Sequence, residues 1–438
     1  MNNNKSFRTW ILINICVSIF FFSCNDVEKN DGIENQNSNW TTSLIDAYRA
    51  LDKNRNIESA DLLFKASDSM PNKNWENYLI VATIYASNQK NNKAFNALER
   101  ALEAGLKDPE LLNSLPDLSL LHNDSRWKTV VSKANENREV YLKTIENLPL
   151  LESLEKMWLL DQQALSEYEQ NLELLDSTAT NEDYSRLFTP VENRWEINKQ
   201  KLDSIINIHG WPGYRLVGET GAKIGWAIPQ HHPDVFFKQK CLSLIKEAVE
   251  KGDTNPNHYA ELHDRIARET WQKQMYGASM GNDAPYPIED PANVDKRRSD
   301  IGLLEPIEVY AYYHGITYQR PSIEKAKLTL KAERDKAQKN YKKFEQLLGE
   351  RQLDSANIYL RKAIKAFGDL SNDQLYQASM KLAQVNYSQS EEISIKIIKV
   401  LIWRKWEGRH DILNNDAFIS LQNNTEWNNI GELLQRSK

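Results

Sequence analysis

The amino-acid sequence predicts an all-α protein, and three observations support this fold class. The chain of 438 residues contains only 16 Gly and 14 Pro, fewer than the frequent turns of β-sandwiches and barrels require. Its residues are 40% hydrophobic and 26% charged, the composition of a folded chain rather than a disordered one. Long stretches repeat apolar residues at intervals of three and four, which is the period of one helix face. At roughly 150 residues per domain, the length predicts two or three domains.

The N-terminal segment has the features of a secretory signal. Lys5 and Arg8 precede an apolar run at residues 10–22, which is too short to span a bilayer. The tetrapeptide Phe-Phe-Ser-Cys that ends at Cys24 resembles the lipobox of bacterial lipoproteins, with Phe in place of the usual Leu. This resemblance implies that residues 1–23 are removed and that Cys24 is acylated. The alternative is an ordinary cleaved signal peptide.

These features predict a location in the bacterial cell envelope, on the periplasmic or surface-exposed face of the outer membrane, with the lipid on Cys24 as the membrane anchor. Residues 24–39 are rich in Asn and Ser. Because they bury too little apolar area to become ordered, we expect a flexible tether. The formal net charge is −6 and no basic run is long, which argues against nucleic acid as a partner.

The next segment, residues 40–147, contains an internal repeat. Ala60 and Ala94 lie 34 residues apart, and apolar residues around them align. The second of the two units resembles a tetratricopeptide repeat, a pair of helices whose small Ala residues permit close approach. The resemblance implies stacked helical hairpins that bind protein or peptide partners.

The C-terminal segment, residues 321–438, continues the same theme. Four helical stretches alternate with short polar breaks. Two sets of apolar residues, one near each end of the mature chain, have identical spacing. They are Leu118, Leu121, Trp127 and Val130 in the first set, and Phe418, Leu421, Trp427 and Ile430 in the second. We interpret them as one capping module that closes two separate repeat stacks, because a terminal repeat needs an atypical polar face. The alternative is chance similarity between amphipathic helices.

Between the stacks, residues 148–320 form the predicted central domain, which holds six of the eight His residues. Its first helix carries apolar residues at helical spacing, with Asp161 as a polar exception. An unpaired buried carboxylate costs several kcal/mol, so Asp161 must be hydrogen-bonded, ion-paired or facing a cavity. The next helix has Asn198 and His209 at similar positions. These groups lie either at the wet edge of an apolar stripe or in a polar pocket between the two helices.

The later helices of this segment have clear boundaries. Asp234 is placed to cap one helix, and Gly252 to end it. Cys241 lies on the apolar face of that helix, so we expect a buried structural thiol rather than a nucleophile. The pair Asn255-Pro256 begins another helix in the usual order of cap and Pro. At about 100° per residue, the adjacent Asp264 and Arg265 cannot both address one atom.

The segment contains no familiar sequence motif for metal, phosphate or dinucleotide binding. Neither His231 with Asp234 nor His258 with His263 has the spacing of two metal ligands on one helix face. We therefore predict neither a metal nor a cofactor, although a metal site assembled from distant His and Asp residues stays open.

A series of short motifs resembles an uncharacterised bacterial family of unknown function that recurs in secreted and lipid-anchored proteins. The motifs follow one another between residues 148 and 312, and they are Asp161-Gln162, Asn198, Gly210-Trp211-Pro212, Val217-Gly218, Gln230-His231, Asp264-Arg265, Gln274-x-Tyr276-Gly277, Pro287-Ile288-x-Asp290 and Val294-Asp295-x-x-Arg298-x-x-x-Gly302-Leu303. This chain has Ala278-Ser279 where such proteins usually continue with Thr-Gln. The resemblance supplies landmarks and implies no mechanism.

Two functions fit these observations. The first is a lipid-anchored interaction scaffold with a ligand-binding central domain, and the second is an envelope hydrolase or transferase. The candidate catalytic residues are His231 as general base with Asp161 or Asp264 to orient it. The candidate ligand-binding residues are Asn198, Gln230, Arg265, Tyr276 and Arg298. Each of them has an alternative role in fixing a helix end or a loop. An enzyme would bring His231, Asp161, Asp264 and Tyr276 together around one pocket.

Overall fold

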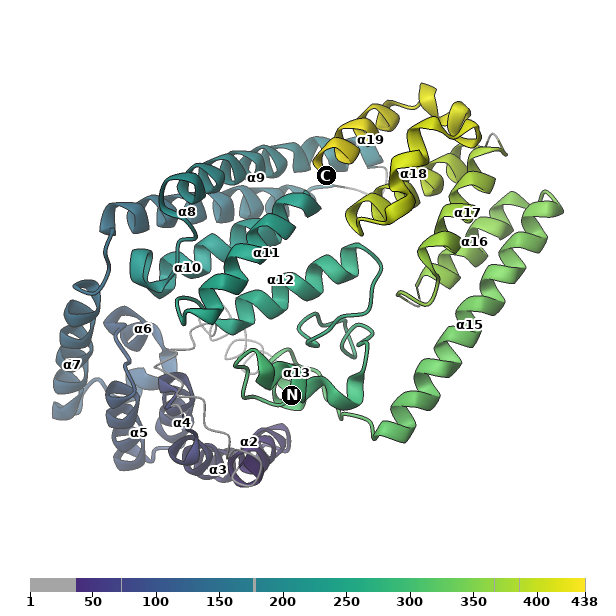
Figure 1. Cartoon of the computed structure of the whole chain (residues 1–438). Helices are drawn as coiled ribbons and strands as arrows, with labels where there is room; N and C mark the ends of the chain where they lie inside the picture. The colour runs from purple at the N-terminus through teal and green to yellow at the C-terminus, as the bar shows by residue number, and fades with distance from the viewer. Residues whose placement is uncertain (1–36, 72, 176–178, 366, 386, 438) are drawn as a thin grey trace. The chain divides into compact units, whose positions relative to one another are not determined.

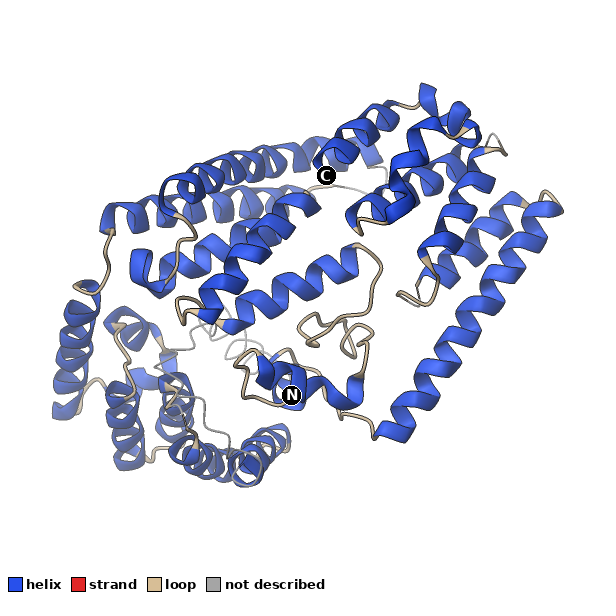
Figure 2. Cartoon of the chain, in the orientation of Figure 1, coloured by secondary structure: helices blue, strands red, loops and turns tan. Residues whose placement is uncertain are grey.

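A computed structural model describes residues 37–71, 73–175, 179–365, 367–385 and 387–437. All regular structure in these ranges is helical (Figure 2), which confirms the predicted all-α class. Only isolated bridges, such as that between Gln274 and Ile288, occur beside the helices of the described ranges. Within the same ranges, no helix combines the length and the apolar character needed to cross a bilayer. The predicted signal peptide, Cys24 and most of the predicted tether lie outside the described residues.

The chain divides into two compact units. Unit 1 consists of Met1–His232, Leu244–His258 and Glu308–Thr317, and unit 2 consists of Pro233–Ser243, Tyr259–Ile307 and Tyr318–Lys438. Residues 233–317 therefore contribute to both units in alternation.

Unit 1 begins with two successive helical hairpins (Figure 1). They are formed by α2 (Asn37–Asp52), α3 (Asn56–Ser69), α4 (Trp75–Ser87) and α5 (Asn91–Glu103), each packed against the next. The repeat positions Ala60 and Ala94 are both fully buried, as expected for small residues where helices approach closely. The Tyr85 hydroxyl donates to the Asp61 carboxylate across the hairpins, at 2.5 Å.

The matched parts of the two predicted capping segments have the same local structure, a 3-10 helix followed by an α-helix. The first consists of the short α6 (Pro109–Ser114), the 3-10 helix η2 (Pro116–Leu121) and α7 (Ser125–Leu142); the second consists of the 3-10 helices η4 (Glu407–Asn414) and η5 (Asp416–Asn423) and α19 (Thr425–Arg436). All eight matched apolar residues are buried. Asp124 and Asn424 each cap the following helix by accepting a backbone N–H. The shared spacing therefore corresponds to a shared local structure.

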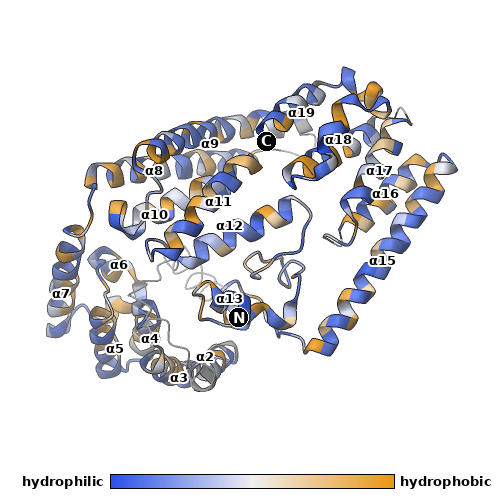
Figure 3. Cartoon of the chain, in the orientation of Figure 1, coloured by the Kyte–Doolittle hydropathy of each residue, from blue (hydrophilic) through white to orange (hydrophobic). Residues whose placement is uncertain are grey.

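Unit 2 ends with the other helices of the C-terminal segment. They are α15 (Ile323–Gly349), α16 (Leu353–Ile364), α17 (Asn372–Ala383) and α18 (Ser388–Trp403). Figure 3 shows α15 as mostly hydrophilic with hydrophobic residues recurring along it. Its buried residues Tyr341, Phe344 and Leu347 join one core with α16, α17 and α18.

The central helices of unit 1 are long and have defined ends. They are α8 (Leu148–Leu172), α9 (Asn181–His209) and α10 (Tyr214–His231), which contact one another pairwise. Thr180 and Asp183 form a capping box at the start of α9. Helix α10 bends at Gly218, whose φ of 69° suits glycine. A Cβ atom at Gly221 would meet the Val217 side chain of α10 at 2.5 Å and Leu151 of α8 at 3.2 Å, so glycine here suits both the bend of α10 and its packing on α8.

The remaining helices show the predicted caps. They are α11 (Val235–Glu250), α12 (Pro256–Glu269), the 3-10 helix η3 (Pro291–Asn293), α13 (Val294–Asp300) and α14 (Ile307–Tyr313). Asp234 accepts the N–H groups of Phe236 and Phe237, and Asn255 accepts that of Asn257. The Cys241 side chain is fully buried. The predicted caps and the predicted buried thiol are therefore confirmed.

Candidate functional site

The Asp161 carboxylate lies in a buried polar cluster of unit 1. The residue is 3% exposed, and its oxygens are hydrogen-bonded by three side chains. Oδ1 accepts from Nδ2 of Asn198 at 3.2 Å, while Oδ2 lies 3.2 Å from Nε2 of Gln162 and 3.0 Å from Nδ1 of His231. The prediction that Asp161 is buried and hydrogen-bonded is confirmed. Through these contacts Asp161 links α8 to both α9 and α10.

His231 is held in a defined orientation at the end of α10. Its ring is stacked against that of Trp158 and tilted against that of Trp195, with centroid distances of 5.8 and 6.0 Å. Because the Asp161 carboxylate accepts a hydrogen bond from Nδ1 of His231, the neutral imidazole carries its proton on Nδ1. Its Nε2 then presents a lone pair. No described residue hydrogen-bonds to Nε2, and the side chain is 27% exposed. His231 is therefore an oriented acceptor that an external group can reach.

Two further polar atoms of this cluster are buried without a hydrogen-bond partner among the described residues. They are Oδ1 of Asn198 and Nε1 of Trp195, three residues apart and so on neighbouring positions of one face of α9. Leaving such a group unsatisfied costs about 1–3 kcal/mol. An acceptor, a donor and the open nitrogen of His231 thus occur together in this cluster.

A second histidine–carboxylate pair lies beside the first. Nε2 of His232 is 3.1 Å from Oε2 of Glu196 on α9. Burial acts to raise the pKa of Glu196, but hydrogen bonds from Gln200 and His232 outweigh it, and the pKa is lowered. Gln230 is buried as well. The segment Gln230-His231-His232 therefore lies where the end of α10 meets α9. The ligand-binding role of Gln230 stays a prediction.

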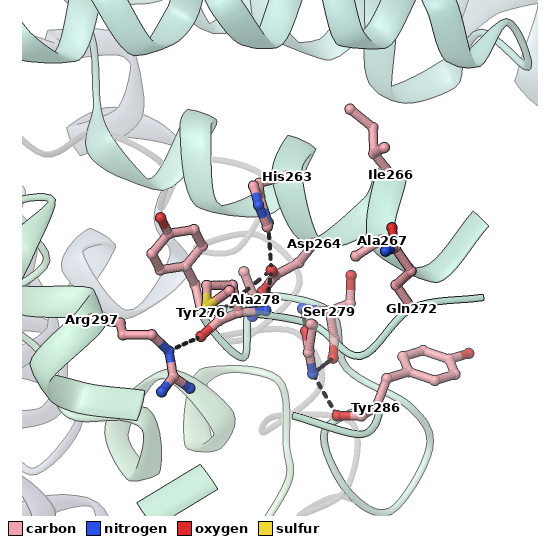
Figure 4. Close-up of polar contacts among 12 residues, drawn as sticks. His263, Asp264, Ile266, Ala267, Gln272, Tyr276, Ala278, Ser279, Tyr286 and Arg297 are labelled. Carbon is pink, nitrogen blue, oxygen red and sulfur yellow. Dashed lines mark hydrogen bonds and ion pairs between the residues drawn. The ribbon is translucent and has the colours of Figure 1, made fainter. Parts of the chain in front are cut away.

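Asp264 forms a different cluster in unit 2 (Figure 4). It is 0% exposed, and its carboxylate accepts the backbone N–H groups of Met275, Tyr276 and Ala278 at 2.8 to 3.3 Å. Oδ1 also lies 3.1 Å from Nδ1 of His263. Of the two carboxylates predicted to orient His231, Asp161 is the one that contacts it, whereas the imidazole beside Asp264 is His263.

The two predicted arginines contact groups of unit 2. Nε of Arg265 donates to Glu269 at 3.1 Å, which also pairs with the buried Lys238 at 2.5 Å. Burial lowers the pKa of both cations. Arg298 is 1% exposed and donates to the backbone carbonyls of Glu305 and Tyr276, at 3.1 Å each. These contacts correspond to the loop-fixing alternative that the sequence left open for Arg298.

The predicted site residues therefore fall into two groups. Asp161, Asn198 and His231 are in contact in unit 1, and Asp264, Tyr276 and Arg298 are linked in unit 2. Sequence reasoning missed the role of His263, whose signal was its position next to Asp264. In the described ranges, no group of three or more His, Cys, Asp or Glu side chains is arranged to hold a metal ion.

Among known proteins, no curated protein and no solved structure matches the chain. One family model does match a part of it. Residues 162–319 match the model of a family of unknown function, DUF6624, and this stretch nearly coincides with the central domain predicted at residues 148–320. The central part of the chain is thus an uncharacterised domain, to which Asn198, His231, His263 and Asp264 all belong.

Proposed function

We propose that this chain is a lipid-anchored envelope protein whose central domain binds a small polar ligand at His231. The observation that supports this proposal is the combination of an oriented imidazole with an open Nε2 and two buried polar atoms that lack partners. Proteins pair nearly all their buried polar groups. A cluster that leaves an acceptor and a donor unsatisfied beside an exposed imidazole is best explained by a ligand or by water that a ligand displaces.

The contacts favour a ligand with hydroxyl or amide groups. Nε2 of His231 requires a hydrogen-bond donor, as does Oδ1 of Asn198, whereas Nε1 of Trp195 requires an acceptor. The rings of Trp158 and Trp195 add flat apolar surfaces. Ligand sites commonly combine aromatic walls with a few polar groups that fix orientation, and neutral sugars and nucleosides carry both kinds of surface.

A thermal-shift screen of the full chain with neutral sugars and nucleosides tests this proposal. A ligand of the site raises the Tm of the wild type, because binding to the folded state stabilises it. The same compound should leave the Tm of the H231A variant unchanged, while the H410A variant, which changes an exposed histidine, should respond like the wild type. If every active compound stabilises H231A and wild type equally, the site is not at His231.

The enzymatic alternative has a specific observation in its favour. A carboxylate at Nδ1 and an open Nε2 are the two features of a histidine general base. In this function Asp161 holds the ring and Nε2 takes a proton from water or a substrate hydroxyl. Hydrolysis of p-nitrophenyl acetate by the full chain, lost in H231Q and retained in H410Q, would support it. A wild-type rate in H231Q would remove it.

The anchor and the repeats complete the proposal. We propose that Cys24 is acylated and that the helical hairpins bind protein or peptide partners in the envelope. Metabolic labelling with an alkynyl fatty acid should mark the wild type and not the C24A variant, and cell fractionation should move C24A out of the membrane fraction. Labelling of C24A at the wild-type level would contradict the anchor.

A further inference from the structure

Unit 2 contains a cluster of three rings that the proposed function does not use. Tyr259 and His263 are four residues apart on α12, so they share one face of that helix, and their ring centroids are 5.9 Å apart. The ring of Tyr276, from the loop after α12, lies 5.2 Å from that of His263 and 5.8 Å from that of Tyr259. Figure 4 shows His263 and Tyr276 beside each other, next to Asp264.

His263 is oriented by the neighbouring carboxylate. Its Nδ1 lies 3.1 Å from Oδ1 of Asp264, so in the neutral ring Nδ1 donates and Nε2 presents its lone pair. Asp264 is itself fixed, because three backbone N–H groups donate to it. No described residue hydrogen-bonds to Nε2 of His263, and the side chain is 29% exposed.

The two phenols supply a hydrogen-bond donor. The rings of Tyr259 and Tyr276 meet edge to face at 5.8 Å, and burial, followed by the interaction with Tyr259, raises the pKa of Tyr276. Tyr276 is buried, whereas Tyr259 is partly exposed. The Tyr259 hydroxyl is therefore the one that can donate to an external acceptor. One face of α12 thus carries an open acceptor on His263 and an open donor on Tyr259.

We propose that His263 and Tyr259 form a second site in this chain, which binds and hydrolyses small acyl compounds such as esters. A water molecule gives a proton to Nε2 of His263 while its oxygen bonds to the acyl carbon. The carbonyl electron pair moves to oxygen, and this oxyanion accepts a hydrogen bond from the Tyr259 hydroxyl. The tetrahedral intermediate then breaks its bond to the leaving alcohol, which takes the proton from His263. The histidine is regenerated, and water is the only co-reactant.

The test uses the full chain and p-nitrophenyl acetate as the probe. Removing the base in H263Q should lower kcat/KM about 100-fold, and removing the donor in Y259F should lower it about tenfold. Y276F should have a smaller effect than Y259F, because Tyr276 is buried whereas Tyr259 is partly exposed. The exposed His410 of the same unit offers a matched control, and H410Q should keep the wild-type rate. Circular dichroism and Tm confirm that each variant is folded.

A second measurement is independent of turnover. Diethyl pyrocarbonate modifies accessible neutral imidazoles, and peptide mass spectrometry locates the product. His263 should react in the wild type, and saturating concentrations of a non-hydrolysed acyl analogue, an acetamide, should protect it. The site is overturned if H263Q hydrolyses the ester at the wild-type rate, or if Y276F loses more activity than Y259F. Activity that depends on His231 alone supports the enzymatic alternative above and overturns this second site, so the two proposals fail separately.

Discussion

The pair His231–Asp161 of unit 1 and the pair His263–Asp264 of unit 2 use the same chemical groups in different ways. Asp161 and His231 are 70 residues apart and come from α8 and α10, so their contact depends on the packing of helices. His263 and Asp264 are adjacent in α12, so their contact is local. The first carboxylate is satisfied mainly by side chains, whereas the second is satisfied mainly by backbone N–H groups.

This difference separates a carboxylate that positions side chains from one that holds the backbone. When Asp161 is substituted, the side chains around it can form new hydrogen bonds, because Oδ1 of Asn198 is an acceptor without a partner. Backbone N–H groups cannot turn into acceptors, so the loop at Met275–Ala278 has no substitute for Asp264. We therefore expect conservative changes at the two positions to differ sharply in their cost to stability.

The largest effect is expected for D264N. An amide keeps one acceptor oxygen and places an NH2 group where the second oxygen was, so at least one backbone N–H faces another donor. Leaving buried partners of a charged group unsatisfied costs about 3–5 kcal/mol. Hydrogen exchange should show the amides of Met275, Tyr276 and Ala278 as protected in the wild type and rapidly exchanging in D264N.

The exposed Asp283 lies in the same loop region and supplies the control. D283N should change the free energy of unfolding by less than about 0.5 kcal/mol, as surface substitutions usually do. If the protection of Met275, Tyr276 and Ala278 is unchanged in D264N, this carboxylate does not hold the loop, and the distinction between the two pairs is lost.

A buried histidine that lacks a carboxylate partner, His258, extends the comparison. His258 is fully buried, its ring stacks on Trp226 at 4.8 Å, and its Nδ1 lies 3.1 Å from the Thr254 hydroxyl. Burial, with a smaller contribution from Lys223, lowers the pKa of His258 to about 3. Above its unfolded pKa of about 6.5 the ring is neutral in both states. Below it only the unfolded chain takes up the proton, so stability falls until the pH reaches the folded pKa.

This single group should lower the free energy of unfolding by about 1.4 kcal/mol for each pH unit between pH 6 and 4. Urea unfolding of wild type and H258Q across this pH range gives the difference in their free energies of unfolding. The pH dependence of that difference is the contribution of His258. H258Q should be less stable at pH 7, because the stacking on Trp226 is lost, and its stability should depend less on pH. Parallel pH profiles for the two proteins would contradict a neutral buried His258.

The sequence was sufficient for features that depend on local structure. The caps at Asp234 and Asn255 follow from side-chain chemistry at fixed offsets, and the burial of Asp161 followed from helical spacing. The different environments of Asp264 and Arg265, one buried and the other half-exposed, also agree with 100° per residue. For His209 the sequence left open the wet edge of an apolar stripe or a polar pocket, and its exposure at the last residue of α9 agrees with the wet edge.

The partners of the site residues could not be predicted in the same way. The contact of His231 with Asp161 depends on how α10 packs on α8, and helical periodicity gives no such distance. The contact of His263 with Asp264 was not predicted either. Adjacent helical residues point about 100° apart, yet the imidazole of His263 reaches Oδ1 of its neighbour. Helical spacing predicts the direction of each Cα–Cβ bond. It does not predict how far a side chain reaches beyond its Cβ atom.

The smallest effect on stability is expected for D161N, although its effect on the site should be large. The amide oxygen of the new asparagine can accept a hydrogen bond from one partner. Its NH2 group can donate to Oδ1 of Asn198 once the side-chain amide of Asn198 has flipped. We therefore expect a loss of about 1 kcal/mol, less than for D264N. His231 loses its carboxylate, however, and with it the preference for a proton on Nδ1.

Nitrogen-15 NMR of the histidine rings measures this preference directly, because protonated and unprotonated ring nitrogens have different chemical shifts. The wild type should show His231 with Nδ1 protonated, and D161N should show a mixture of the two neutral forms, while the signals of His263 stay unchanged. A D161N variant that unfolds as readily as D264N would mean that Asp161 also serves mainly to hold the fold. The polar cluster of unit 1 would then be a structural core rather than a site that awaits a ligand.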